Sequence, residues 1–349
     1  MAQVTLMSWN LGALDAARAS QAGMAYVQYL ASAMEVGKVA LAAFSGIRSD
    51  LGEQLGAALA MELYNRGQGQ ASWNHLACPP LGAGRGEQYL FVWNLAAIEA
   101  RPFPGTTDYW QWDYPLPGGQ EGVYGFPRST GQSSDLPPMR MLFRPAGSEK
   151  LVSVAIFDGP DWLLGDAAGV AAQAACGNLA IIPDFDQGDG GVIMGTFHVP
   201  HDDDVSVAGS NGAAVFAALA GPGGKYVQAI RNTRSVLADQ PLVAITLEDA
   251  EPQSADTLFF RADGPGNGVA CASAGIADLL RDALGTMDDQ GNFAAAPMGL
   301  PLALVEAAAA GADGVSAGPD GSYGKLDDAF AVYRALVGDH LPALVTLTC

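Results

Sequence analysis

Histidine and carboxylate side chains gather in one short segment of the chain. His198, His201 and Asp202 lie in the run HVPHDDD, and Asp203 and Asp204 complete it. Imidazole and carboxylate groups are ligands for zinc, manganese or iron, so this segment could hold a metal ion. A solvated acidic loop has the same composition, and the two interpretations both stay open.

Further polar residues lie where predicted strands begin or end. Asn10 ends the N-terminal run VTLMSWN, and Asp339 and His340 precede the C-terminal run PALVTLTC. These side chains could bind a ligand, or they could satisfy neighbouring backbone groups. Arg48 and Arg140 could hold a phosphate or carboxylate through paired N–H donors, or they could pair with nearby acidic residues.

Aromatic side chains form a third group, in a segment rich in Pro and Gly. The group consists of Tyr109, Trp110, Trp112, Tyr114 and Tyr124. Such rings often anchor protein interfaces or stack on flat ligands. They also cover sheet edges as a small secondary core, so the pattern predicts either an interface or local packing.

The composition indicates a folded, acidic protein. Of its 349 residues, 49% are hydrophobic and 15% are charged, which is enough apolar material for a sizeable core. The formal net charge of -20 argues against nucleic acid and anionic membranes as partners, so we expect a protein partner or self-association. The four cysteines lack CxxC spacing and are expected to be buried thiols.

The start of the chain lacks the basic and apolar regions of a signal peptide, and no apolar run reaches membrane-spanning length. We therefore expect a cytoplasmic location by default, with leaderless secretion as the open alternative.

The order of predicted elements indicates one α/β domain over residues 1–349. Strands are predicted over 4–10, 37–47, 88–95, 139–145, 150–157, 178–183, 190–197, 242–247, 256–262 and 342–349. Helices are predicted over 14–36, 49–65, 162–176, 211–220 and 326–337. The segments 103–138 and 263–326 are predicted insertions, because they are rich in Pro and aromatic residues or in Gly and Ala.

Seven short runs occur in an order that is similar to one superfamily. They are SWNLG (8–12), FSGIR (44–48), PPLGAGRGEQYLFVWN (79–94), VAIFDGP (154–160), VIMGTFH (192–198), ADTLFF (255–260) and GDHLPALVTL (338–347). The chain resembles the endonuclease/exonuclease/phosphatase superfamily, most closely its deoxyribonuclease I branch. The resemblance implies an α/β (α+β) fold, a four-layer α/β/β/α sandwich of two mostly antiparallel sheets flanked by helices. It also implies an active site at one edge of the two sheets.

The resemblance gives roles to individual residues. Members of the superfamily hold a divalent cation with carboxylates and bind phosphate with Asn and His side chains. The positions that match the family are the phosphate-binding Asn10, the backbone-contacting Arg48 and Arg140, the histidine-supporting Glu87, and the C-terminal site residues Asp256, Asp339 and His340.

Four central positions depart from the family pattern. Gly46 replaces the metal-binding Glu, Phe157 replaces the first catalytic His, and Thr196 and His198 replace the Asp and Asn of a GDFN-like motif. A general acid or base contributes roughly 10²–10⁴-fold to a rate, and groups that act as a unit fail together.

We therefore predict a deoxyribonuclease I-like domain that has lost phosphodiesterase activity and serves as a binding or structural/assembly protein. The ligand would lie among Asn10, Arg48, Arg140, His198 and the remaining Asp256–His340 half of the site.

The alternative is a metal-dependent phosphoesterase or nuclease with a rebuilt site that uses Mg²⁺ or Mn²⁺. In that hypothesis His340 acts as the base, and the cation is bound by Asp339, His198, His201 and Asp202.

Overall fold

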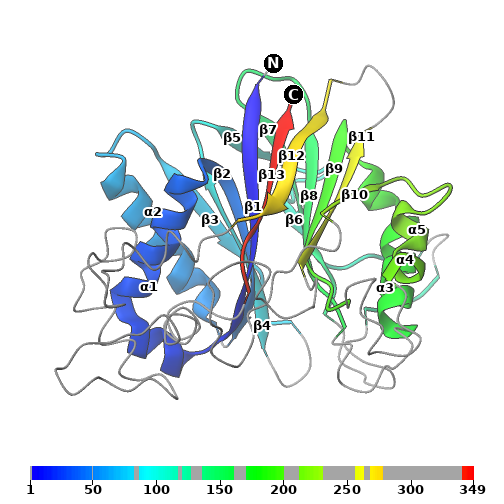
Figure 1. Cartoon of the computed structure of the whole chain (residues 1–349), viewed down its shortest axis with the longest axis horizontal. Coiled ribbons are helices and arrows are strands. Elements are labelled where there is room, and N and C mark those ends of the chain that lie inside the picture. The colour runs from blue at the N-terminus through cyan, green and yellow to red at the C-terminus, as the bar shows by residue number, and fades with distance from the viewer. Residues whose placement is uncertain are drawn as a thin grey trace, which may run out of the picture.

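Two β-sheets pack face to face, and helices cover the outer face of each sheet (Figure 1). The structure is a computed structural model that describes residues 2–48, 50–81, 86–116, 120–126, 136–160, 170–199, 212–230, 256–262, 268–277 and 340–349. Each outer face packs on helices and the inner faces pack on each other. The predicted four-layer α/β/β/α sandwich is confirmed.

The first sheet has six strands and is covered by two long helices. Its strand order is β12 (Ala270–Ile276), β13 (Ala343–Thr348), β1 (Gln3–Leu14), β2 (Val39–Arg48), β4 (Glu87–Asn94) and β3 (Trp73–Ala77). The covering helices are α1 (Ala16–Val36) and α2 (Leu51–Arg66). β1 and β2 run parallel and the other neighbours run antiparallel, as expected for a mostly antiparallel sheet.

The second sheet repeats this arrangement with seven strands. Its strand order is β10 (Val227–Ile230), β11 (Asp256–Ala262), β9 (Gly190–Thr196), β8 (Val152–Asp158), β7 (Met139–Pro145) and β5 (Ile98–Arg101), and β6 (Trp110–Gln111) also pairs with β7. Its outer face packs on α3 (Val170–Ile181), the 3₁₀ helix η3 (Pro183–Asp186), α4 (Gly212–Val215) and α5 (Ala217–Ala220). β8 and β9 are the parallel pair of this sheet.

Alternation along the central strands separates the inner core from the outer core. In β8, Val154 and Ile156 belong to the core between the sheets, whereas Ala155 and Phe157 belong to the core under α3. Successive strand residues point to opposite faces, so a strand covered on both sides is apolar throughout. The same alternation directs Asp158, two residues after Ile156, away from the α3 side.

Most of the predicted elements are present, and one prediction is wrong. The apolar run 178–183 is not a strand, because its first four residues form the last turn of α3. Ala171, Ala175 and Leu179 continue one buried helical face through that turn. The predicted strand 242–247 and helix 326–337 lie outside the described residues.

Parts of both predicted insertions belong to the sheets. β6 lies in segment 103–138 and pairs with β7, and β12 lies in segment 263–326 and pairs with β13 at the edge of the first sheet. Of the cysteines, Cys78, Cys176 and Cys349 are buried as predicted, and Cys271 is half-buried. Within the described part of the chain, no helix is long and apolar enough to cross a membrane.

Candidate functional site

Polar side chains from both sheets meet at one edge of the sandwich. Asn10 lies on β1, Asp158 and Thr196 end β8 and β9, His198 follows β9, and His340 precedes β13. We call these five residues the strand-edge cluster. The sequence predicts Asn10, His198 and His340 as site residues, and the structure brings these three to one place.

A hydrogen bond between Asn10 and Thr196 joins the two sheets inside the cluster. The Asn10 Nδ2 group donates to Thr196 Oγ1 at 3.0 Å, and its Oδ1 atom accepts the Gly12 N–H at 2.9 Å. Both side chains are buried. The Asn10 amide therefore holds the ends of β1 and β9 together.

Asp158 and His198 form an ion pair or a hydrogen-bonded pair beside that bond. His198 Nε2 lies 3.0 Å from Asp158 Oδ1, and the Asp158 backbone N–H donates to the Tyr89 hydroxyl at 3.0 Å. The His198 backbone has a φ of 51°, a left-handed conformation that few non-glycine residues adopt. A carboxylate on one ring nitrogen fixes the orientation of the imidazole, which is what a general base or an anion-binding histidine requires.

His340 completes the cluster from the C-terminal side. Its ring centroid lies 6.3 Å from that of His198, with the two rings nearly perpendicular at 89°. The His340 backbone carbonyl accepts the indole N–H of Trp9 at 2.9 Å, which ties it to β1. The cluster thus presents two imidazoles side by side.

Gly46 and Phe157, where the resemblance implies a Glu and a His, are accommodated by the local structure. Gly46 has a φ of 68°, so a glutamate there would adopt a strained left-handed conformation. Its neighbour Ser45 is fully buried, and the Ser45 hydroxyl has no hydrogen-bond partner among the described residues. Phe157 packs against Phe126 and Phe197 in the outer core, with ring centroids 5.7 and 5.4 Å apart.

The side chain that β8 contributes to the cluster is Asp158, which is not among the predicted site residues. The available signal was strand alternation, because Val154 and Ile156 face inward and Asp158 is next in that series. Tyr89, whose hydroxyl accepts the Asp158 N–H, is not a predicted site residue either.

Arg48 and Glu87 lie opposite each other where β2 ends and β4 begins. Glu87 is buried, and Arg48 is half-buried with no partner for its Nε among the described residues. The unpartnered Arg48 Nε is itself buried, so it is not an open donor for a ligand at the strand-edge cluster.

Arg140 is fully buried and forms a cluster of its own. Its guanidinium donates to the Asp184 carbonyl, to Gln111 Oε1 at 2.7 Å and to Gln187 Oε1 at 3.3 Å. It also lies 4.2 Å over the Phe103 ring, and burial lowers its pKa. None of these partners belongs to the strand-edge cluster, so the structure does not place Arg140 with Asn10 and His198.

Several predicted residues are described only in part or lie outside the described residues. Asp256 pairs with Thr196 in the β11–β9 ladder, but its side chain is outside the description. His201, Asp202 and Asp339 are outside it altogether. Of the four predicted metal ligands, His198 is therefore the one that the structure describes.

The described residues of the cluster do not fit the divalent-cation site that the resemblance implies. Mg²⁺ and Mn²⁺ prefer several oxygen ligands. The cluster offers one described carboxylate, Asp158, which already pairs with His198. Among the residues that the structure describes, no group of three His, Cys, Asp or Glu side chains could hold a metal ion.

The predicted aromatic group is divided between two environments. Tyr109 is exposed, and Trp110 and Trp112 pack against the core between the sheets. Tyr114 is buried in the outer core, where its hydroxyl donates to the Pro138 carbonyl at 2.9 Å and burial raises its pKa. Tyr124 packs against the outer core and is half-buried, so Tyr114 is the member of the group that is closed to a ligand or partner.

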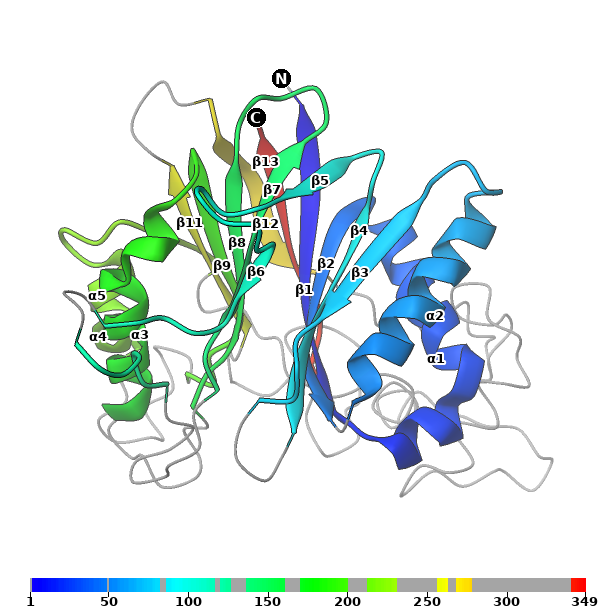
Figure 2. The same ribbon diagram turned by 180° about the vertical axis from the view of Figure 1, so that it is seen from behind.

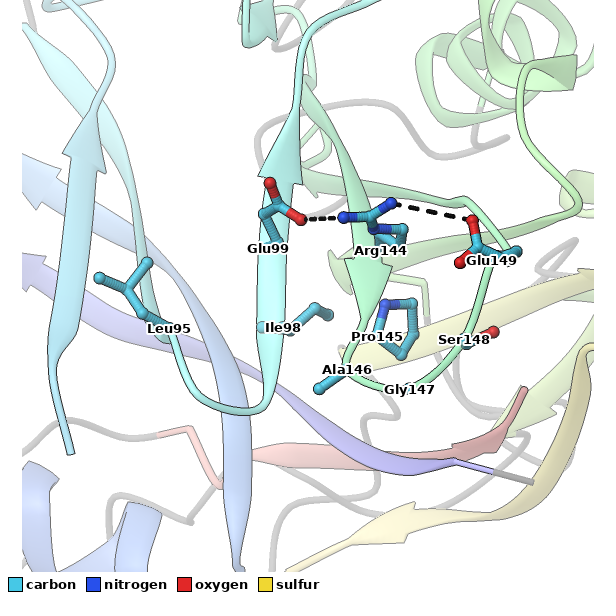
Figure 3. Close-up of a pocket in the computed structure, with 9 residues that line it drawn as sticks. All are labelled: Leu95, Ile98, Glu99, Arg144, Pro145, Ala146, Gly147, Ser148 and Glu149. Atoms are coloured by element: carbon cyan, nitrogen blue, oxygen red, sulfur yellow. Dashed lines mark hydrogen bonds and ion pairs between the residues drawn. The ribbon is translucent and has the colours of Figure 1, made fainter. Parts of the chain in front are cut away.

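A separate hollow lies at the β7–β8 turn, at the opposite end of β8 from Asp158 (Figure 3). In this hollow, Arg144 Nη2 lies 2.6 Å from Glu99 Oε2, and Arg144 Nη1 lies 3.9 Å from Glu149 Oε2. Arg101 also contacts Glu99, and the two arginines lower the pKa of this carboxyl. The Arg144 charge is thus balanced by carboxylates, which makes the hollow a poor site for an anion.

Comparisons with solved structures support the fold over nearly the whole chain. An endonuclease/exonuclease/phosphatase from Bacteroides vulgatus is 12% identical and has a TM-score of 0.54, with 99% of each chain covered. A mannosyl-6-phosphatase from Bacteroides thetaiotaomicron is 12% identical and has a TM-score of 0.53, with 99% of this chain and 100% of that chain covered. A family protein from Leptotrichia buccalis is 10% identical and has a TM-score of 0.51, with 99% and 100% covered.

No protein-family model matches the sequence, and no curated protein matches it. The similarity therefore lies in the structure. The chain has the deoxyribonuclease I-like fold of the endonuclease/exonuclease/phosphatase superfamily.

Proposed function

We propose that this chain is a deoxyribonuclease I-like domain that has lost phosphodiesterase activity and binds a ligand at the strand-edge cluster. The observation that carries the proposal is the state of Thr196. It stands where the resemblance implies a catalytic Asp, and its buried hydroxyl is hydrogen-bonded to Asn10. A neutral group engaged in holding two sheets together supplies neither a metal ligand nor a proton acceptor.

The ligand class that suits the cluster is a small anion such as a phosphate monoester. His198 and His340 lie side by side, and the His198 side chain is 24% exposed. Imidazole N–H groups bind phosphate oxygens strongly when their orientation is fixed in advance. The Asp158–His198 contact supplies such an orientation. A structural or assembly role with a protein partner would use the same edge as its contact surface.

Calorimetric titration with inorganic phosphate tests this binding proposal. We expect the wild type to bind phosphate and His198→Asn to bind it roughly tenfold more weakly, because one charge-assisted hydrogen bond is lost. Asn suits the left-handed backbone at this position, so the variant should keep its fold. Glu149→Gln, in the β7–β8 turn at the opposite end of β8 from Asp158, is the control and should bind as the wild type does. Equal phosphate binding by the wild type and His198→Asn would contradict the proposal.

The second candidate is a phosphoesterase with a rebuilt site, and the Asp158–His198 contact favours it. A histidine held by a carboxylate can take a proton from water, with His340 beside it as a further acid or base. This candidate requires stoichiometric Mn²⁺ or Mg²⁺ binding that His198→Ala abolishes. Wild type that does not bind either ion under saturating conditions would exclude it.

A further inference from the structure

A pocket of about 490 Å³ opens on the side of the sandwich where β3 of one sheet lies near β5 and β6 of the other (Figure 2). Aromatic residues contribute much of its lining, with Trp93 from β4, Tyr109 from the loop before β6, and Trp110 from β6. Its volume lies in the range of about 300–1,000 Å³ that is usual for small-molecule sites. None of its lining residues belongs to the strand-edge cluster.

Hydrogen bonds hold the loop that closes one side of this pocket. The Phe103 N–H donates to the Asp108 carbonyl at 2.9 Å, and the Thr106 N–H donates to the Phe103 carbonyl at 3.0 Å. The Asp108 N–H in turn donates to Thr106 Oγ1 at 3.1 Å. The pairing of Trp110 with Met141 on β7 fixes the end of the loop. Asp108 and Tyr109 are therefore positioned by the fold although both side chains are exposed.

The charge on the pocket lining is negative. Asp108 is the charged residue of the described lining, which contains no lysine or arginine. His75 also lines the pocket, and its ring nitrogen contacts Glu53 at 2.9 Å. A cation is therefore favoured over an anion in this pocket.

Trp93 lines the inner side of the pocket. Its side chain is 3% exposed and packs edge-on against Phe143, and its indole nitrogen is buried without an acceptor among the described residues. Trp93 therefore contributes ring surface to the lining rather than a hydrogen bond to a ligand.

We propose that this pocket binds a small organic cation, an alkyl-substituted ammonium. Aromatic rings attract such an ammonium through their π-faces, and Asp108 supplies the opposite charge. The inference is independent of the function proposed for the strand-edge cluster.

Choline is the probe, and the neutral alcohol in which a carbon atom replaces its nitrogen is the matched control ligand. Both have the same shape and the same hydroxyl group, so only the charge differs. Titration of the full chain, followed by tryptophan fluorescence and by calorimetry, should give at least roughly threefold tighter binding for choline than for the alcohol. Equal affinities, or binding of neither compound at millimolar concentration, would overturn the proposal.

Two variants, each with a matched control, assign the binding to this pocket. Asp108→Asn should weaken choline at least roughly twofold while leaving the alcohol unchanged, because it removes only charge. Glu149→Gln removes one exposed charge elsewhere and should leave both affinities unchanged. Tyr109→Ala should weaken choline further, whereas Tyr64→Ala removes a similarly exposed tyrosine on α2 and should not. Choline binding that is insensitive to both Asp108→Asn and Tyr109→Ala would place it elsewhere and refute the assignment.

Discussion

The Arg140 cluster and the strand-edge cluster both hold a nitrogen-bearing side chain by hydrogen bonds, but the two side chains differ in burial. Arg140 is fully buried, and its two terminal nitrogens are occupied by a backbone carbonyl and two glutamine side chains. The His198 side chain is 24% exposed and is held on one nitrogen by Asp158. The hydrogen bonds of the Arg140 cluster hold segments of the chain together. The Asp158–His198 contact of the strand-edge cluster instead orients the His198 imidazole toward the sheet edge. A polar group that is exposed at the sheet edge is a candidate binding group, whereas a fully buried polar group has a structural role.

The largest effect on stability should come from removing the buried guanidinium. Arg140→Met should lower the free energy of unfolding by about 3 kcal/mol, because Gln111, Gln187 and the Asp184 carbonyl, all half-buried, lose a charged donor. Urea denaturation measures the change. Arg144→Met is the control, and its partly exposed ion pairs should be worth less than about 1 kcal/mol. Equal losses of unfolding free energy in the two variants would show that the buried Arg140 stabilises the fold no more than the partly exposed Arg144.

The next effect should come from the bond that joins the two sheets within the strand-edge cluster. Asn10→Ala should lower the free energy of unfolding by about 1–2 kcal/mol, because it leaves the buried Thr196 hydroxyl and the Gly12 N–H without this partner. Thermal or urea unfolding checks the value. A loss as large as that of Arg140→Met would make Asn10 primarily a structural residue.

A smaller effect on stability is expected at the exposed end of the cluster. His198→Asn should change the free energy of unfolding by less than about 1 kcal/mol, since Asn tolerates the left-handed backbone and the lost contact is partly exposed. The same variant should lose phosphate affinity. A loss of unfolding free energy as large as the loss of phosphate-binding free energy would show that His198 mainly stabilises the fold.

The smallest effect at neutral pH should come from the buried thiol of Cys78. Burial raises its pKa from 9.0 to about 12, although a hydrogen bond from the Tyr89 N–H partly opposes this. The folded state then holds its proton more tightly than the unfolded state, so the stabilisation is complete below pH 9 and is lost as pH rises toward 12. Urea midpoints over this pH range should fall more steeply for the wild type than for Cys78→Ala. Parallel slopes would contradict the assignment.

The sequence predicts the sheets better than it predicts the cluster. Strong apolar runs such as 88–95 and 139–145 are strands because both of their faces are buried. The short edge strand β3, with Asn74 and His75 in its centre, carries no such signal and was not predicted. The run 178–183 was mistaken for a strand because its residues are apolar whichever element they form.

The sequence also predicts only some of the residues of the strand-edge cluster. Asn10, His198 and His340 stand out by residue type and position. Asp158 and Tyr89 do not, because their roles depend on the approach of β4 to the end of β8. Arg140 shows the converse, since its residue type matches a phosphate-binding role but its partners come from the turn after α3. Such pairings arise from packing between elements that are far apart in the sequence.

We propose that the strand-edge cluster binds a ligand without hydrolysing phosphodiesters. The most direct test is the initial rate of bis(p-nitrophenyl) phosphate hydrolysis with Mg²⁺, Mn²⁺ or chelator, compared between the wild type and His340→Ala. We expect the wild-type rate with either metal to equal the rate of the variant and the rate with chelator. A metal-dependent wild-type rate that disappears in His340→Ala would contradict it and establish the rebuilt phosphoesterase.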